Sequence, residues 1–240
     1  MIIADLHTHT NVSHHAFCTI DEMCDQAKRM GHFAMAITNH AATIPDSAHD
    51  WHFLSLRVLP RVNQGVFLIR GAEVNVVDKR GTIDLNEYIL RGLEFVIASM
   101  HEPCFKEPSP ENCTNAWLGV LENPCVNLLG HMGNPYFKCD YKTVIKRCSE
   151  TNKVVEINNN SMFVRQGSGE NCLEIAKLCM EYGVPVMVNS DSHHKNTLGQ
   201  VDLAMGILQG IGFPEQLIIN KQKDTLIEYF KNTKNLHMEE

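Results

Sequence analysis

Histidine is the residue type that stands out in this sequence, by number and by position. The 240 residues contain 13 histidines, and several of them directly follow a short apolar run. The first apolar run leads into His7-Thr8-His9. Alternate residues of an extended chain point the same way, so these two imidazoles would be presented together. Alone, such a pair is a weak indication of a metal site.

Further histidines and carboxylates follow or lie within the later apolar runs. A single histidine after a strand is usually a surface residue or a satisfied core residue. A long series at equivalent positions is hard to explain in that way, and it predicts a metal centre. The series consists of His40, Glu73, His101, His131, Glu156, Asp191 and His193.

The mixture of ligand types restricts the choice of metal. Imidazole and carboxylate together suit Zn²⁺, Mn²⁺ or Fe²⁺ better than Mg²⁺ or Ca²⁺, which prefer oxygen ligands. About nine candidate ligands are more than one tetrahedral ion can use, so we expect roughly two or three ions per chain.

Seven apolar runs are interleaved with segments of helical period. A capping box, Thr19-Ile20-Asp21-Glu22, starts the first helix, which is expected to end near Gly31. This alternation predicts repeated βα units around a parallel sheet, and no linker divides residues 1–240, so we expect one domain. The predicted strands are 1–6, 33–38, 66–70, 95–100, 126–130, 154–157 and 184–188. The later predicted helices are 115–121, 141–150, 173–182, 203–208 and 225–230.

The predicted barrel explains why ligands that are distant in sequence would meet in space. In such barrels the carboxyl ends of the strands converge on one face, where active sites are built. Most of the candidate ligands follow a predicted strand at this end, and Glu156 lies within one. The sequence therefore predicts one shared metal centre.

The composition restricts the classes of function and the cellular compartment that are compatible with this chain. The formal net charge of -7 disfavours extended nucleic-acid binding, whereas small phosphorylated metabolites stay acceptable because bound cations reverse the field inside a cleft. The nine cysteines include no CxxC pair, and the N-terminal segment has no basic region of a secretory signal. No apolar run approaches the roughly 20 residues of a membrane span. We therefore expect reduced thiols and a cytoplasmic location.

At these residues the sequence resembles the PHP (polymerase and histidinol phosphatase) superfamily over nearly the whole chain. The shared motifs are Asp5-Leu6-His7-Thr8-His9, Ile37-Thr38-Asn39-His40, Gly71-Ala72-Glu73, His131 with Gly133-Asn134-Pro135, Glu156-Ile157-Asn158-Asn159 and Ser190-Asp191-Ser192-His193. It is most similar to the small single-domain phosphatases of the YcdX-like group. These share Trp51-His52-Phe53, Pro60-Arg61-Val62 and His101-Glu102-Pro103.

The resemblance implies a distorted seven-stranded (βα)₇ TIM-like barrel with a trinuclear site, for which we expect zinc, with manganese or iron as the alternatives. It implies that one ion is held by His7, His9, Glu73 and Asp191. Glu73 would bridge to a second ion held by His101 and His131. The third ion would be held by His15, His40 and His193.

One departure from the family pattern concerns this third ion. The family usually has aspartate before the second-strand histidine, where this chain has Asn39. Losing an outer-shell carboxylate typically costs about 10–100-fold in metal affinity or activity. We therefore expect the third ion to bind more weakly, but not to be lost.

The expected activity is hydrolysis of small phosphomonoesters by a metal-bound hydroxide. The catalytic set would be His7, His9, Glu73 and Asp191, with His194 or an aspartate as a guess for the group that protonates the leaving alkoxide. Arg165 is a candidate to clamp the substrate phosphate, although an exposed, solvating arginine is equally compatible.

Three other functions stay open. A PHP-type nuclease is disfavoured by the acidic balance and by the lack of an accessory domain. An amidohydrolase-type C–N hydrolase typically needs a modified lysine or a different histidine order, and the lysines here avoid strand ends. A non-catalytic metal-binding regulatory module has only Asn39 in its favour. The sequence leaves the alcohol portion of the substrate and the oligomeric state open, although homo-oligomers are common among compact barrels.

Overall fold

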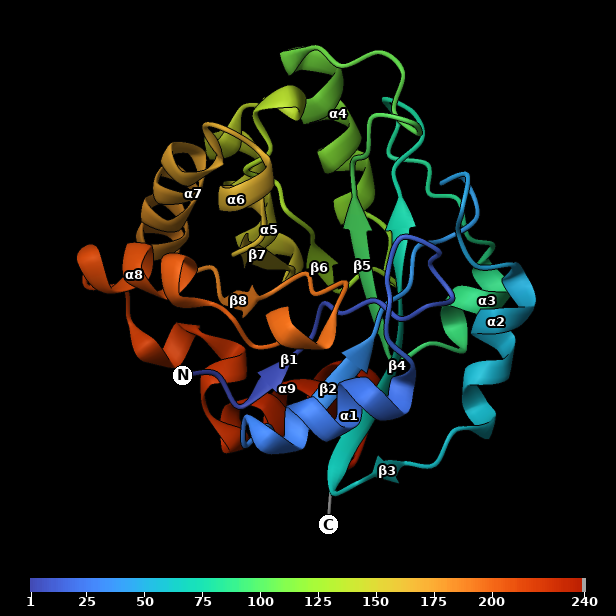
Figure 1. Ribbon diagram of the computed structural model, residues 1–240. Coiled ribbons are helices and arrows are strands. Elements are labelled where there is room, and N and C mark those ends of the chain that lie inside the picture. The colour runs from blue at the N-terminus through green and yellow to red at the C-terminus, as the bar shows by residue number, and fades with distance from the viewer. Residues whose placement is uncertain (239–240) are drawn as a thin grey trace.

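In the computed structural model, which describes residues 1–238, seven parallel strands form a nearly closed barrel (Figure 1). This confirms the predicted fold class. One further short strand, β3 (Val62–Asn63), pairs antiparallel with β4. The parallel strands, in their order around the barrel, are β1 (Ala4–Asp5), β2 (Ala34–Ile37), β4 (Val66–Asn75), β5 (Phe95–Ser99), β6 (Leu128–Leu129), β7 (Val154–Asn158) and β8 (Val186–Asn189).

Strand β4 is twice as long as the apolar run that predicts it, because it changes partner halfway. Its first half pairs with β2 up to Arg70, and its second half pairs with β5 from Gly71 onward. A side chain at Gly71 would place its Cβ 2.6 Å from the carbonyl oxygen of Phe95, so only glycine allows the strands to approach this closely. The extension carries Glu73 into the middle of the barrel mouth, where it forms an isolated bridge with His40.

The seam between β1 and β8 is closed by side chains and by one short bridge. Thr8 and Ser192 form that bridge beyond the ends of the two strands. At the opposite end, the buried Asn220 donates to the carbonyl oxygens of Ala4 and Val188, at 2.9 and 2.7 Å. A barrel of seven strands thus uses an asparagine amide where an eighth strand would otherwise supply hydrogen bonds.

The helices lie outside the strands, and the six longest of them follow the helical patterns of the sequence. The predicted capping box at Thr19 is present, and its side chain accepts a hydrogen bond from the amide of Glu22. Three short helices, α2, α3 and α6, have no predicted counterpart. The helices are α1 (Ile20–Arg29), α2 (Asp50–Ser55), α3 (Glu87–Arg91), α4 (Pro110–Leu121), α5 (Tyr141–Thr151), α6 (Ser161–Val164), α7 (Ser168–Tyr182), α8 (Asp202–Gly210) and α9 (Lys223–Lys234). The 3₁₀ turns are η1 (Leu56–Val58), η2 (Pro135–Phe137), η3 (Lys195–Thr197), η4 (Glu215–Leu217) and η5 (Ile219–Lys221).

The apolar core has two parts with different tasks. The larger part joins the strands to the surrounding helices. The smaller part fills the barrel interior and its amino-terminal end, where Phe230 of α9 packs against Phe95 with ring centroids 5.7 Å apart. Because this end is filled by apolar side chains, polar side chains gather at the other end.

Two sequence expectations about the cysteines and the helices can be compared with the structure. All nine cysteines are free thiols, eight of them buried and Cys125 half-buried, as the absence of a pairing motif predicts. Within residues 1–238, no helix combines the length and the apolar composition needed to cross a bilayer.

Candidate metal centre

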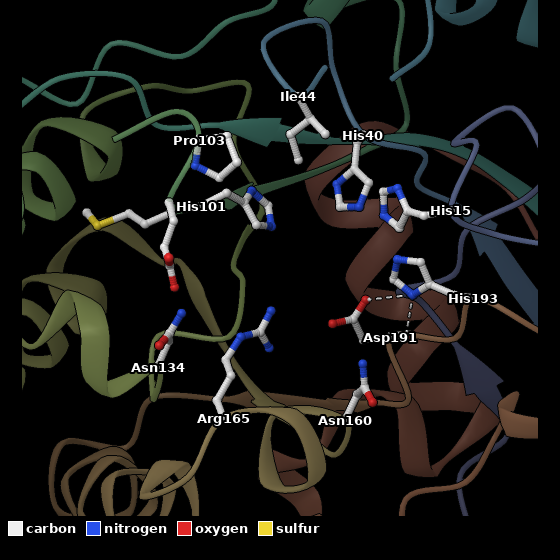
Figure 2. Close-up of a pocket in the computed structure, with 12 residues that line it drawn as sticks. His15, His40, Ile44, His101, Pro103, Asn134, Asn160, Arg165, Asp191 and His193 are labelled. Atoms are coloured by element: carbon white, nitrogen blue, oxygen red, sulfur yellow. Dashed lines mark hydrogen bonds and ion pairs between the residues drawn. The ribbon is translucent and has the colours of Figure 1, made fainter. Parts of the chain in front are cut away.

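A cavity of about 400 Å³ opens at the carboxyl end of the strands (Figure 2). Four imidazoles, from His15, His40, His101 and His193, surround it on one side in Figure 2. The guanidinium group of Arg165 points toward its centre from the other side. We call this space the central cavity; it is also lined by Ile44, Met100, Glu102, Pro103, Asn134, Asn160 and Asp191.

Glu73 lies at the centre of the polar cluster and is fully buried. Its Oε2 is 2.6 Å from Nδ1 of His40, and its Oε1 is 3.1 Å from Nε2 of His131. Its two oxygens lie within 3.6 Å of ring nitrogens from five histidines, namely His7, His9, His40, His101 and His131. One carboxylate among so many imidazoles could serve as a ligand to more than one divalent ion.

The first group of ligands combines side chains from the loops after β1 and β8. Nε2 of His9 lies 3.2 Å and Nε2 of His7 lies 3.5 Å from the same oxygen of Asp191. Candidate ligand atoms of these three residues all lie within 4.8 Å of one another. The family resemblance implies the same three residues, with Glu73, as the ligands of one ion.

The second group gathers around the ends of β4, β5 and β6. The Nε2 atoms of His101 and His131 lie 3.2 Å apart, and each is within 3.6 Å of Oε1 of Glu73. His40, Glu73 and His101 also form a compact group of candidate ligand atoms. His40 therefore lies closer to this group than the resemblance implies.

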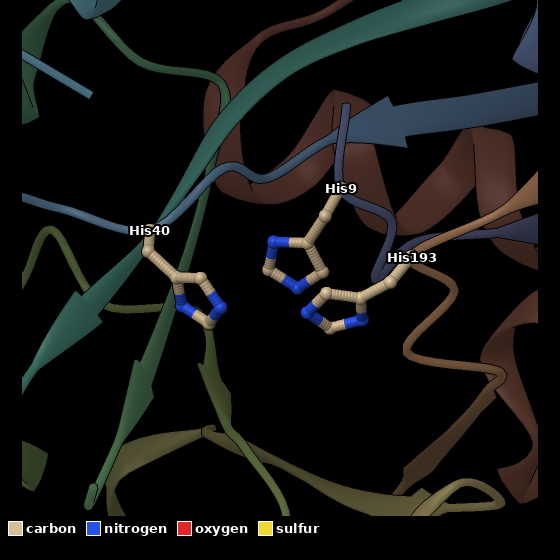
Figure 3. Close-up of side chains that lie close together, drawn as sticks. All are labelled: His9, His40 and His193. Atoms are coloured by element: carbon tan, nitrogen blue, oxygen red, sulfur yellow. The ribbon is translucent and has the colours of Figure 1, made fainter. Parts of the chain in front are cut away.

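The third group is made of histidines alone. The rings of His9 and His193 stack with centroids 4.2 Å apart, and His9 and His40 stack at the same distance (Figure 3). His15 is expected here, and its ring centroid lies 5.0 Å from that of His40 and 4.9 Å from that of His193. The structure brings His15 beside the group, but the compact set of ligand atoms is His9, His40 and His193.

Several buried ligand atoms make no hydrogen bond within residues 1–238. They are Nε2 of His7, both ring nitrogens of His9, Nδ1 of His40 and Oε2 of Glu73. An unsatisfied buried polar atom typically costs about 1–3 kcal/mol, so a group of them needs a compensating partner. Imidazole nitrogens and carboxylate oxygens that converge in a buried cluster fit divalent cations such as zinc.

The charge states of most of the cluster also suit cations. His7 is the exception, because burial lowers its pKa but Glu156, Glu73 and Asp191 outweigh burial and hold that pKa well above its ordinary value. Burial raises the pKa of Glu73, but His7 and other histidines nearby outweigh it and hold that pKa well below its ordinary value. The pKa of Asp191 is held well below its ordinary value in the same way, with burial opposed mainly by His7 and His9. Burial lowers the pKa of His9 and of His101 well below the ordinary histidine value. Ionised carboxylates and neutral imidazoles are the forms that bind metals.

Glu156 has a supporting position that its place in the strand series does not reveal. Its Oε1 lies 2.8 Å from Nδ1 of His7, and its Oε2 accepts a hydrogen bond from the backbone amide of His131 at 2.7 Å. Asn189 donates to the same carboxylate at 2.9 Å. With Nδ1 of His7 bound to this carboxylate, Nε2 of that ring is left to face the cluster, which is how outer carboxylates orient metal-binding histidines.

Two further supporting residues are not predicted from the sequence. Oδ1 of Asn75 lies 2.7 Å from Nδ1 of His101, and a carboxylate oxygen of Asp46 lies 2.8 Å from Nδ1 of His15. Asn75 could have been found, because it follows Glu73 by two positions in one strand and so points the same way. Asp46 could not, since it lies in a loop whose path only the structure shows.

Asn39 contacts the loop after β1 instead of a metal-facing imidazole. Its Oδ1 accepts hydrogen bonds from the Thr10 amide at 2.8 Å and from the Ser13 hydroxyl at 3.3 Å. Its Nδ2 donates to Thr10 at 2.9 Å and lies 3.1 Å from Nε2 of His52. Within residues 1–238 Asn39 makes no hydrogen bond to the ring of His40. The structure therefore shows no direct contact by which Asn39 would weaken binding of the third ion.

Backbone strain occurs at two of the candidate ligands. His131 has a φ of +29° and Asp191 a φ of +54°, in the region that non-glycine residues seldom adopt. Such conformations cost of order 1–3 kcal/mol and persist where neighbouring contacts impose them. The amide of His131 is held by Glu156, and the side chain of Asp191 accepts from Asn158 at 3.3 Å. Strain at these positions is typical of a functional site.

The structure separates the two remaining candidates, Arg165 and His194. Arg165 lines the central cavity, and one of its guanidinium nitrogens donates to the Ser161 hydroxyl at 2.7 Å. His194 does not line the cavity; its Nδ1 accepts a hydrogen bond from the Asn196 amide at 3.2 Å. The proton-donating role expected for His194 therefore stays a prediction, which its place outside the cavity lining does not support.

Comparisons with known proteins bear on the family and the fold of this chain. A family model described as PHP domain matches residues 5–162. A protein of Clostridium novyi named a probable phosphatase is 42% identical over 231 residues, covering 96% of this chain and 95% of its own. A probable phosphatase of Thermoanaerobacter is 40% identical over 236 residues, covering 97% and 96%.

A solved structure supports the fold independently of close sequence similarity. It is the histidinol phosphate phosphatase of Lactococcus lactis, complexed with zinc, L-histidinol and phosphate. It superposes with a TM-score of 0.60 at 15% identity, covering 88% of this chain and 94% of its own. At that identity the likeness is one of fold.

Proposed function

Since the chain belongs to the PHP domain family, we propose that it is a metal-dependent phosphatase of small phosphomonoesters, with residues 1–240 forming one catalytic domain. The observation that carries the proposal is the cluster around Glu73, in which buried imidazole and carboxylate atoms converge and several of them make no hydrogen bond within residues 1–238. The phosphatase names of relatives that align over almost the whole chain support the same activity.

The residues fit three divalent ions, for which zinc is our first choice and manganese or iron the alternatives. His7, His9 and Asp191 would hold one ion, and Glu73, His101 and His131 a second, with Glu73 shared. His40 and His193 would hold the third together with His9, and His15 lies beside them. When bound, such ions supply a nucleophile from water near neutral pH and neutralise charge on the phosphoryl oxygens.

The chain's own side chains have three tasks in this proposal. The imidazoles and carboxylates fix the positions of the cations. Glu156 and Asn75 keep His7 and His101 turned toward the cluster. Arg165, whose guanidinium points into the cavity in Figure 2, would bind and orient the phosphate through charge-assisted hydrogen bonds.

Replacement of Arg165 by alanine is expected to raise KM for p-nitrophenyl phosphate about tenfold or more, with a smaller change in kcat. A hydrogen bond to a charged group contributes about 1.5–3 kcal/mol, and one that acts on substrate and transition state alike affects mainly KM. Steady-state kinetics measure both constants. Arg57→Ala, at an exposed arginine away from the central cavity, is the matched control. An unchanged KM in Arg165→Ala would exclude the phosphate-binding role.

The proposed function is tested by metal content and turnover of the native chain. After loading with Zn²⁺ or Mn²⁺ and desalting, we expect about three ions per chain and hydrolysis of p-nitrophenyl phosphate. A chelator should abolish turnover, and added metal should restore it. Less than about one ion per chain under replete conditions would overturn the proposal.

The same measurements distinguish the alternatives. Preferential hydrolysis of the diester bis(p-nitrophenyl) phosphate would indicate a nuclease-like activity, although the net charge of -7 argues against nucleic acid. Full metal loading without hydrolysis of any phosphoester would indicate a non-catalytic module. No lysine lines the central cavity within the described residues, which argues against the amidohydrolase alternative.

A further inference from the structure

The wall of the central cavity away from the histidines carries polar groups that the proposed chemistry does not use. Asn134 and Asn160 point into the cavity in Figure 2, on the same side as Arg165. Glu102 lines the cavity as well, directly after the candidate ligand His101. These groups line the same cavity as Arg165, so a monoester whose phosphate contacts Arg165 would place its alcohol portion within their reach.

Glu102 has a charge that works against phosphate binding. It is exposed and makes no ion pair or side-chain hydrogen bond within residues 1–238. A carboxylate beside a site for a phosphate dianion repels it, because like charges at close range disfavour binding. Its presence in the cavity is explained if the leaving group supplies hydrogen-bond donors to it.

The two asparagines indicate which donors these are. Asn160 makes no side-chain hydrogen bond in the described part of the chain. Oδ1 of Asn134 accepts from the Tyr136 amide at 3.1 Å, which leaves its NH₂ group to donate. Amides both donate and accept, as hydroxyl groups do, whereas an ammonium group only donates. In the described residues the cavity lining contains no Phe, Tyr or Trp ring for stacking or for a cation–π contact.

We propose that Glu102, with Asn134 and Asn160, selects monoesters whose leaving group is a polyol or a sugar. This inference rests on the proposed phosphatase function and names the substrate class of the same site. The carboxylate of Glu102 would accept from one or two hydroxyl groups, and the amides would bind their neighbours. A cavity of about 400 Å³ is large enough for a compound of this kind.

The test compares substrates that differ only in hydroxyl groups. Glycerol 3-phosphate and propyl phosphate have the same carbon chain, and the ratio of their kcat/KM values measures hydroxyl recognition. Because the two alcohols differ in leaving-group reactivity, the change of this ratio between native protein and Glu102→Gln is decisive. We expect the ratio to fall about tenfold in Glu102→Gln, since a charged hydrogen bond becomes a neutral one. Glu107→Gln, at an exposed glutamate outside the cavity, should leave it unchanged.

The other outcomes overturn the inference without affecting the phosphatase proposal. A ratio unchanged by Glu102→Gln excludes hydroxyl recognition by this residue. If Glu102→Gln lowers kcat/KM only for phosphoethanolamine, relative to ethyl phosphate, the carboxylate recognises an ammonium group instead of hydroxyl groups. Turnover of p-nitrophenyl phosphate in all variants shows that the phosphatase function stands in either case. If the native protein hydrolyses no ester, the phosphatase proposal fails. Calorimetry then measures the dissociation constants of the same compounds, and their ratio tests hydroxyl recognition.

Discussion

Glu73→Gln is expected to lower hydrolysis of p-nitrophenyl phosphate by more than about 100-fold and to remove at least about one ion per chain. Changes to residues that only support metal ligands already cost about 10–100-fold, and Glu73 lies at the centre of the cluster. The glutamine side chain has no negative charge to attract a cation. Its NH₂ group would also point toward imidazole nitrogens, which cannot accept a hydrogen bond once a cation is bound to them. The fully buried side chain has no room to turn away. Metal analysis and steady-state kinetics on the same samples measure both effects.

The control for this prediction is a glutamate that shares the residue type but not the site. Glu87 is an exposed residue of α3 that pairs with Arg91, and Glu87→Gln should keep full metal content and turnover. Circular dichroism and thermal unfolding show whether Glu73→Gln is folded. A folded Glu73→Gln protein with native metal content and more than half of the native turnover would contradict the bridging role.

Replacement of Asp191 and of His9 should abolish turnover but remove different amounts of metal. Asp191 belongs to one compact group of ligand atoms, with His7 and His9, whereas His9 also belongs to the group with His40 and His193. We therefore expect Asp191→Asn to lose about one ion per chain and His9→Ala about two, with turnover reduced more than about 100-fold in both. Metal analysis after desalting, with kinetics on the same protein, tests the order.

His14→Ala provides the matched control, because His14 is exposed and belongs to none of these groups. It should keep native metal content and turnover. Equal metal loss in Asp191→Asn and His9→Ala would show that His9 serves a single ion, and would leave His15 as the third ligand that the family resemblance implies. Native turnover in either variant would refute the assignment of the first ion.

Elements with a strong periodic pattern could be predicted from the sequence. The long amphipathic helices and seven apolar strands follow from hydrophobic periodicity, and the start of α1 follows from its capping box. The short α2, α3 and α6 could not be predicted, because a helix of four to six residues has too few positions to show a period. The length of β4 was also underestimated, since Gly71 and Glu73 interrupt its apolar run.

The residue types at the barrel mouth follow from the order of strands and polar residues along the chain. Because the carboxyl ends of parallel strands meet there, the sequence predicts that His7, His101 and Asp191 lie together. The phosphatase proposal depends on that convergence and on the family motifs, and both can be read from the sequence.

The grouping and the support of these residues, by contrast, required the folded chain. The place of His40 between two ligand groups, the contact of Asp46 with His15 and the position of His194 outside the cavity lining depend on loop paths. The conformation of a loop is fixed by contacts with segments far away in sequence. In an extended segment, a shift by one residue turns a side chain to the opposite face. For that reason the sequence could name the ligands, whereas their grouping and the polar wall around Glu102 required the folded chain.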